Sequence, residues 1–405
     1  DELLVCSSAA GGLKMVALGL VPDLTAKAAR TAASNAGAKV VKTFAYEISG
    51  SEQQEIYDIN PDLVLLCGGT DGGNKEVIIA NAKHLVAIDR PFTTIVAGNK
   101  SANDDIKAIF NEAGKDVVIT ENVMPQFNKL NIEPARDAIR QLFISRIIEA
   151  KGLNILQAMT PYKIIPTPLA VLHACELLSK GTKTQQGRGD LLAVDIGGAT
   201  TDVYSMASGE PTVDNTMLKG LPEPWMKRTV EGDLGMRYSL THVYEQIPGA
   251  DNPENEYMQQ VKAWVELCTA RPDTLAAPGS EEEKLEEFLG RSAVSMAVER
   301  HCGRIADVFT PLGLMHTQEG KDLMNVPSVI GIGGVLRNSR RPEEILKGSL
   351  YDFMHPECTK PRKPKFYLDQ KYIFASMGLL RSINPELAFE LLDKETVEIG
   401  CNATV

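Results

Sequence analysis

The sequence predicts an α/β protein whose first part contains a mainly parallel sheet. Over residues 1–120, short apolar or β-branched runs alternate with amphipathic stretches of helical length, as in parallel strands joined by crossover helices. Further along the chain, two short strands flank a Gly-Gly bend, and a later apolar strand also ends in Gly-Gly. The 405 residues are 43% hydrophobic and 23% charged, an ordinary globular composition that is long enough for two or three domains.

We assign residues 1–130 to a first α/β domain. Its strands are expected at residues 3–7, 40–46, 63–67, 93–97 and 116–120. Its helices are expected at residues 23–36, 52–59, 75–83 and 103–113. Right-handed crossovers between such elements place the strands side by side in one sheet.

A helical connector is expected at residues 131–190. Pro134 suits the first turn of a helix at residues 133–150. A second helix is expected at residues 170–178, and a polar, turn-rich stretch then leads to residue 190.

Residues 191–405 are expected to form a second, larger α/β domain with a helical excursion around residues 245–310. Its elements are expected to be a strand–turn–strand unit, a long amphipathic helix, a buried strand and an apolar helix, at residues 191–205, 283–308, 326–332 and 372–380.

Charge and cysteine usage exclude several classes of function. The net charge of −11, without a long acidic run, argues against binding to nucleic acid or to an anionic membrane. Apolar runs are far shorter than the roughly 20 residues that cross a bilayer. The seven cysteines are far apart and form no CxxC pair, which favours reduced thiols and a cytoplasmic protein.

The segment that carries most chemical information reads Asp195-Ile196-Gly197-Gly198-Ala199-Thr200-Thr201-Asp202. Its glycines allow a close approach of the backbone to a ligand, and the turn amides with the Thr200 and Thr201 hydroxyls can converge on an anion. Asp195, at the end of a strand, is placed to bind magnesium through water. We therefore expect ATP and magnesium here. The alternative is a hairpin whose glycines only make the turn.

A second glycine-rich segment follows about 130 residues later. Gly331, Gly333 and Gly334 lie at the end of an apolar strand, where a backbone without Cβ atoms can lie against a ribose or a base. The familiar P-loop and GxGxxG phosphate motifs are absent from the sequence.

The segment around Asp233 offers further candidate residues. Asp233 and Gly235 could contact phosphates at the start of a helix, with simple capping by Asp233 as the alternative, and Glu231 could order an attacking water. Residues 68–73 follow a buried strand, and either a tight turn or a ligand site at the sheet edge fits them.

These motifs resemble the actin-like ATPase (ribonuclease H-like) superfamily, with residues 191–205 similar to its phosphate 2 hairpin and residues 329–338 to its adenosine motif. The chain further resembles the MutL/GlmL family, the accessory proteins of glutamate (methylaspartate) mutase, which are unrelated to the mismatch-repair protein. The similar blocks are SSAAGGLKM, LCGGTDGG, AGNK, TENVMP, IPTPLAV and VEGDLGM, at residues 7–15, 66–73, 97–100, 120–125, 165–171 and 230–236.

The resemblance implies an actin-like ATPase fold with an additional α/β domain. It also implies an ATP-dependent reactivating chaperone that releases damaged cofactor from an adenosylcobalamin-dependent mutase, with catalytic roles for Asp195 and Glu231. A nucleotide-binding scaffold without turnover and a small-molecule kinase are the alternatives. A homodimer is compatible with the resemblance, and the sequence does not give the oligomeric state.

The superfamily pattern also has an earlier phosphate 1 hairpin, for which no segment before residue 190 is similar. The chain opens at Asp1 without a Met and is apolar from Leu3. We therefore expect a missing amino-terminal segment that contains phosphate 1.

Overall fold

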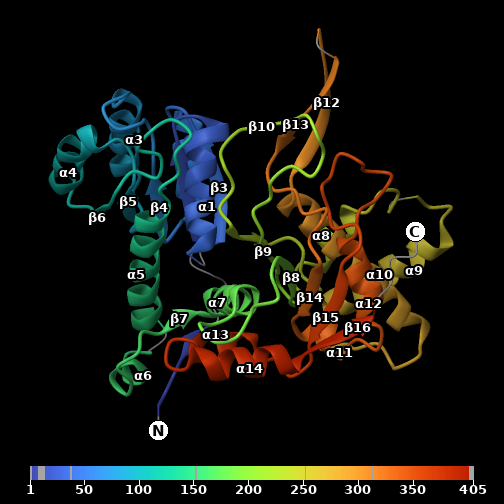
Figure 1. Ribbon diagram of the computed structural model, residues 1–405. Helices are drawn as coiled ribbons and strands as arrows, with labels where there is room; N and C mark the ends of the chain where they lie inside the picture. The colour runs from blue at the N-terminus through green and yellow to red at the C-terminus, as the bar shows by residue number, and fades with distance from the viewer. Residues whose placement is uncertain are drawn as a thin grey trace. The chain divides into compact units, whose positions relative to one another are not determined.

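The computed structural model describes residues 2–7, 14–36, 39–150, 153–250, 252–311 and 313–400 (Figure 1). Two compact units are present: unit 1 comprises residues 1–169 and 220–222, and unit 2 comprises residues 170–219 and 223–405. The boundary at residue 169 lies inside the connector expected at 131–190. Both units mix helices with parallel strands, which confirms the predicted α/β class.

The main sheet of unit 1 has five parallel strands in the order β3-β2-β4-β5-β6. They are β2 (Lys14–Gly19), β3 (Lys39–Ala45), β4 (Leu63–Leu66), β5 (Thr93–Val96) and β6 (Val117–Ile119). The last four confirm the expected strands to within two residues at each end. Strand β2, which lies between β3 and β4, was not predicted. The strand expected at residues 3–7 is only the two-residue β1 (Cys6–Ser7), paired with β7 (Ile165–Pro166).

Helices cover both faces of this sheet, so its central strands are apolar on both sides. The helices are α1 (Lys27–Asn35), α2 (Gly50–Ile59), α3 (Glu76–Ala87), α4 (Asn103–Glu112) and α5 (Glu133–Ala150), with a π-helical turn η1 (Pro22–Ala26), a 3-10 turn η2 (Lys100–Ala102) and the short α6 (Asn154–Ala158). Met15 and Leu65 pack with α1 and α5 in one buried cluster, while Val16 and Leu66 pack with α2, α3 and α4 in another. This alternation is that of strands buried on both faces.

The main sheet of unit 2 has six strands in the order β11-β9-β8-β14-β15-β16. They are β8 (Leu191–Ile196), β9 (Thr201–Met206), β11 (Met226–Glu231), β14 (Ser328–Ile332), β15 (Lys365–Asp369) and β16 (Thr396–Gly400). Strands β8, β14 and β15 are parallel, and the others are antiparallel to their neighbours. The carboxyl ends of β8, β14 and β15 therefore meet at one edge.

The helices of unit 2 are α7 (Thr167–Lys180), which begins in unit 1, α8 (Leu240–Glu245), α9 (Glu256–Ala270), α10 (Glu281–His301), α11 (Gly334–Asn338), α12 (Pro342–Leu346), α13 (Phe374–Leu380) and α14 (Pro385–Glu395), with a 3-10 turn η3 (Lys347–Ser349). Helix α10 packs against α12, η3 and β9. Its residues Leu289, Val294 and Val298 are fully buried in the core of unit 2.

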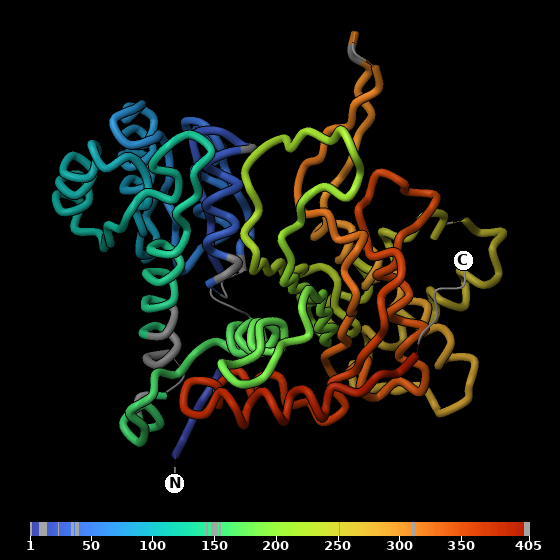
Figure 2. Tube along the Cα trace, in the orientation of Figure 1, coloured from blue at the N-terminus to red at the C-terminus, as the bar shows by residue number. Residues whose placement is uncertain are grey.

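A second sheet of unit 2 has the order β10-β13-β12, from β10 (Thr216–Lys219), β12 (Arg304–Thr310) and β13 (Gly313–Glu319). Figures 1 and 2 show β12 and β13 as a long hairpin that extends from this unit. The helix expected at residues 283–308 was therefore wrong beyond His301. Ile305 and Val308 keep a helical spacing, but they lie in a strand that pairs with β13 along its whole length.

In the part of the chain that the structure describes, no helix is long and apolar enough to cross a membrane.

Candidate functional site

Strands β8 and β9 form the predicted hairpin. Asp195 pairs with Asp202 and Ile196 with Thr201, so both aspartates lie at the end of the strand pair that carries the turn. The turn between the strands is closed by the Gly197 amide, which donates to the Thr200 carbonyl at 3.0 Å. The sequence motif is therefore a tight turn at the carboxyl end of β8, where ligands bind in parallel α/β sheets.

The segment after β11 packs directly on this turn. The Met236 amide donates to the Gly197 carbonyl at 3.0 Å, and the Arg237 and Tyr238 amides both donate to the Gly198 carbonyl at 2.8 Å. Gly235 allows this contact, because a Cβ on it would lie 2.3 Å from the Ala199 carbonyl carbon. The structure thus brings Gly235 to the hairpin turn.

Two of the candidate hydroxyls already have partners within the protein. Thr201 is fully buried, and its hydroxyl donates to the Leu234 carbonyl. The Thr200 hydroxyl donates to Oδ2 of Asp202 at 3.4 Å, a weak contact that a ligand could replace. Thr200 is therefore the better placed of the two to meet an anion.

The second glycine motif lies next to Asp195. Strand β14 pairs with β8, with Ile332 opposite Asp195. Gly333 follows with φ of 98°, and a Cβ on it would lie 2.6 Å from Oδ1 of Asp195. The two motifs, separated by about 130 residues of sequence, therefore meet at one strand end.

The other two glycines of this motif have different surroundings. Gly331 is buried, and a Cβ there would lie 3.0 Å from Leu336 and 3.2 Å from Leu346, so the glycine lets helices pack on the strand. Gly334 is exposed at the start of α11, and its nearest neighbour is 3.8 Å from where a Cβ would be. Gly334 is the position of the three that leaves open space for a ligand.

Asp195 lies in a strongly acidic environment. Burial, together with the nearby carboxylates of Asp202 and Asp369, raises the pKa of Asp195 to about 7, although Arg228 opposes the shift. Burial likewise raises the pKa of Asp369, whose carboxylate accepts from the Ile373 and Phe374 amides. A cation at this position would relieve the repulsion among the three carboxylates.

Arg228 on β11 neutralises one of these acids. Its Nε donates to Oδ1 of Asp202 at 2.7 Å, and both side chains are almost completely buried. This ion pair leaves Asp195 as the partly accessible carboxylate of the hairpin.

Glu231 and Asp233 are joined by one arginine from the end of α10. Arg300 lies 2.7 Å from Oε2 of Glu231 and 2.8 Å from Oδ1 of Asp233, and Gln246 donates to Asp233 at 3.0 Å. The hydrogen bond from Arg300 lowers the pKa of Asp233. Helix capping by Asp233 was a wrong expectation, because residues 232–239 are not helical and α8 begins only at Leu240.

Sequence reasoning missed three residues of the site. Asp369 could have been found, because it ends an apolar run, Phe366-Tyr367-Leu368, as Asp195 ends another. Arg228 and Arg300 carry no such signal, since their partners are distant in the sequence.

Metal binding by protein groups alone has no support here: among the described residues, no three His, Cys, Asp or Glu side chains are grouped to hold a metal ion. A magnesium ion at Asp195 would have to take its other ligands from water and phosphate, as magnesium ions usually do at nucleotide sites.

Known proteins resemble this chain along nearly its whole length. The family model described as MutL protein matches residues 1–396. Protein MutL of Clostridium tetanomorphum is 47% identical over 399 residues, which are 98% of this chain and 86% of that protein. The nucleotide-free structure of an acetone carboxylase, reported for a mechanism of ATP-dependent acetone carboxylation, matches with 13% identity and a TM-score of 0.32, over 91% of this chain and 59% of that one.

Of the sequence blocks that resemble the MutL/GlmL family, the one at residues 7–15 lies mostly outside the described residues.

Proposed function

Because the chain belongs to the MutL protein family, we propose that it is an ATP-binding accessory protein of an adenosylcobalamin-dependent mutase. Its role is to reactivate the mutase by releasing damaged cofactor. The proposal of ATP binding depends on one observation: the two glycine motifs lie side by side, with Gly333 directly beside the Asp195 carboxylate.

ATP would lie along the carboxyl ends of β8 and β14. The Gly197–Thr200 turn offers backbone amides and the Thr200 hydroxyl to the phosphates, and the open backbone at Gly334 faces the nucleoside. Asp195 would hold magnesium through water, which offsets the repulsion from Asp202 and Asp369. Glu231, kept in place by Arg300, would orient the attacking water.

Reactivation requires that ATP favours one of two conformations of the protein. A ligand can shift such an equilibrium only by its difference in affinity for the two states. The segment at residues 232–239, which would face the phosphates, is hydrogen-bonded to the hairpin turn and is linked to α10 through Arg300. Nucleotide contacts at the turn would therefore affect both the segment and α10.

The test is reactivation of a turnover-inactivated mutase by this protein, with and without magnesium and ATP. We expect ATP-dependent recovery of mutase activity and release of inactive cobalamin, and Asp195→Ala should abolish both. Asp214→Ala is the matched control, because Asp214 is an exposed carboxylate of the same unit.

Three results would separate the alternatives. ATP binding without turnover or reactivation would favour a nucleotide-binding scaffold. ADP formation only with an added small substrate would indicate a kinase. Absence of ATP binding by calorimetry would contradict the nucleotide site itself.

A further inference from the structure

Three loops of unit 1 meet at the carboxyl edge of its parallel sheet. They follow the neighbouring strands β4, β5 and β6, at residues 67–75, 97–102 and 120–132. This is the edge at which ligands of open parallel α/β sheets bind.

Two buried amide side chains fix the shape of these loops. Asn99, which is fully buried, accepts from the Gly72 amide at 3.1 Å and donates to the Gly73 carbonyl at 2.9 Å. Asn122, 3% exposed, donates to the Gly69 carbonyl and to Oδ1 of Asp71, both at 3.0 Å. Burying two such polar groups is costly unless they are fully hydrogen-bonded, as they are here, so the loops have one defined geometry.

The loops enclose a cleft of about 630 Å³, within the size range of small-molecule sites. Its polar lining includes Asp71, Lys100, Asn103, Glu121, Asn122 and Asn131. Oδ1 of Asn103 is shielded from solvent and has no hydrogen-bond partner among the described residues. A buried acceptor left in this state loses its hydration without compensation, which a donor on a bound molecule would restore.

The charges of the cleft indicate which molecule fits. Oδ1 of Asp71 accepts from the Lys100 amide at 3.1 Å and from Asn122, whereas Oδ2 lies 3.9 Å from the Lys100 ammonium and accepts no hydrogen bond from another described residue. Glu121 is exposed and accepts from Asn131 at 3.0 Å. The cleft thus offers two carboxylates and one amide oxygen as hydrogen-bond acceptors, and one lysine as a positive charge. This excess of acceptors and negative charge suits a ligand with hydroxyl donors and repels a phosphate group.

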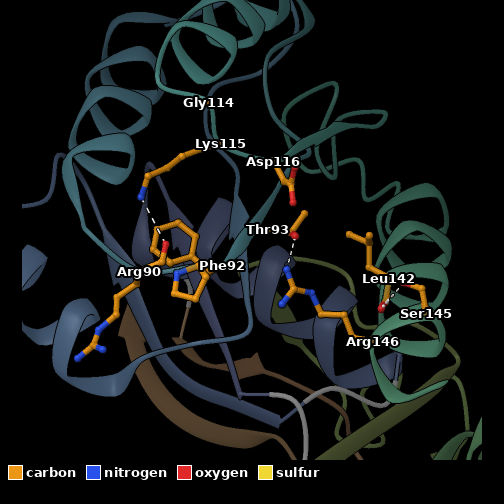
Figure 3. Close-up of a pocket in the computed structure, with 10 residues that line it drawn as sticks. Arg90, Phe92, Thr93, Gly114, Lys115, Asp116, Leu142, Ser145 and Arg146 are labelled. Atoms are coloured by element: carbon orange, nitrogen blue, oxygen red, sulfur yellow. Dashed lines mark hydrogen bonds between the residues drawn. The ribbon is translucent and has the colours of Figure 1, made fainter. Parts of the chain in front are cut away.

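A second cleft, at the opposite edge of the same sheet, shows the contrast (Figure 3). It is lined by three cationic side chains, but each has a partner in the protein. Lys115 donates to the Ile88 and Arg90 carbonyls, Arg146 donates to the Thr93 hydroxyl at 2.6 Å, and Arg90 stacks on Tyr57. These groups have structural partners, and none of the described residues that line this cleft carries a buried polar atom without a hydrogen-bond partner.

We propose that the cleft at the carboxyl edge of unit 1 binds the ribose of an uncharged nucleoside, with the vicinal hydroxyls donating to Asp71 and Glu121 and a further donor reaching Asn103. A carboxylate that accepts from a ribose diol is a common arrangement at the edge of such sheets. This site is separate from the proposed ATP site and does not depend on it.

The test is titration of the whole protein with adenosine, followed by calorimetry and by hydrogen exchange read by mass spectrometry. We expect adenosine to slow exchange in residues 68–74, 99–103 and 120–125. Asp71→Asn and Glu121→Gln should each weaken binding about tenfold, the effect of losing one charged hydrogen bond. Glu112→Gln, an exposed carboxylate on α4 outside the cleft, should leave binding unchanged.

Two ligand-side controls complete the design. 2′,3′-Dideoxyadenosine lacks both hydroxyls and should not bind, and saturation with magnesium-ATP should leave the unit 1 protection in place. Protection confined to residues 195–201 and 331–336 would overturn the unit 1 site and leave the ATP site standing. Equal binding of the dideoxy compound, or no protection of unit 1 by millimolar adenosine, would also overturn it. Glu121 is exposed, so Glu121→Gln should leave the loops intact. This variant therefore still tests the site if Asp71→Asn loosens the loops.

Discussion

At the scale of single residues, the most informative group is the Asp195 carboxyl. Its pKa of about 7 lies above the ordinary aspartate value because of burial and of two neighbouring acids. Ionised Asp195 is therefore costly to the folded protein until a cation arrives. The same repulsion that destabilises the ionised carboxyl would favour the binding of magnesium.

The first prediction concerns the pH dependence of stability. The folded-state pKa is raised, so this group stabilises the fold below about pH 4 and loses that contribution as pH rises through 7. Asp195→Asn removes the titration. We expect the stability advantage of the variant over the parent to grow by about 2–3 kcal/mol between pH 5 and pH 8, in urea unfolding without nucleotide. An equal difference at both pH values would contradict this account.

The second prediction concerns the buried ion pair. Arg228→Met leaves Asp202 buried without its charged partner, and we expect a loss of about 3–5 kcal/mol of unfolding free energy. The double variant Asp202→Leu with Arg228→Met should recover most of the loss, because no uncompensated charge remains. A double variant as unstable as the single one would show that the arginine acts through other contacts.

At the scale of elements, the end of helix α10 contacts the segment at residues 232–239. Arg300, in its last turn, holds both Glu231 and Asp233, and the segment between residues 232 and 239 rests on the hairpin turn. Helix, strand β11 and hairpin are thus connected at one place.

The third prediction follows from this connection. Arg300→Gln should speed hydrogen exchange in residues 232–238, because two carboxylates lose their shared cation. It should also raise the pKa of Asp233 toward the ordinary aspartate value, observable by NMR titration. Arg304→Gln is the matched control, since Arg304 is exposed and pairs with Glu299 and Glu357, which lie outside the segment. Unchanged exchange in Arg300→Gln would contradict the role given to Arg300.

The fourth prediction concerns the contact between the segment and the turn. Gly235→Ala places a methyl group 2.3 Å from backbone, which cannot move aside as a side chain can. We expect a loss of about 2 kcal/mol or more in thermal or urea unfolding, by the usual cost of overpacking. Gly50→Ala, with open space around its Cβ and a place in the first turn of α2, should be neutral or slightly stabilising.

Local sequence signals predicted many of the helices and strands, but few of the side-chain contacts and strand pairings between them. The apolar runs at β4 and β5, and the hairpin at Gly197-Gly198, follow from composition and turn residues alone. Strand β12 does not, because Ile305 and Val308 suit a helix as well as a strand until β13 pairs with them. Arg228 and Arg300 depend on partners that only the folded chain brings close.

At the scale of the whole molecule, the two units can be followed separately. Both tryptophans of the chain, Trp225 and Trp264, belong to unit 2, whereas helices and strands of both units contribute to circular dichroism. Tryptophan fluorescence therefore reports the unfolding of unit 2 alone.

The fifth prediction uses this reporter. Magnesium-ATP at about 100 times its dissociation constant should stabilise unit 2 by about 2.7 kcal/mol. The fluorescence transition should move upward, while adenosine should move only a transition seen by circular dichroism. If ATP leaves the fluorescence transition in place, the ATP site is not in unit 2.

The three residues Gly220–Pro222 belong to unit 1 although the chain on both sides of them belongs to unit 2. Leu221, 5% exposed, packs with Met15 and Leu63 in the core of unit 1. During synthesis on the ribosome, the core of unit 1 is therefore incomplete until residue 222 has emerged, by which time the β8–β9 hairpin is already outside. A fragment that stops at residue 169 would lack this side chain, and with it part of the core of unit 1.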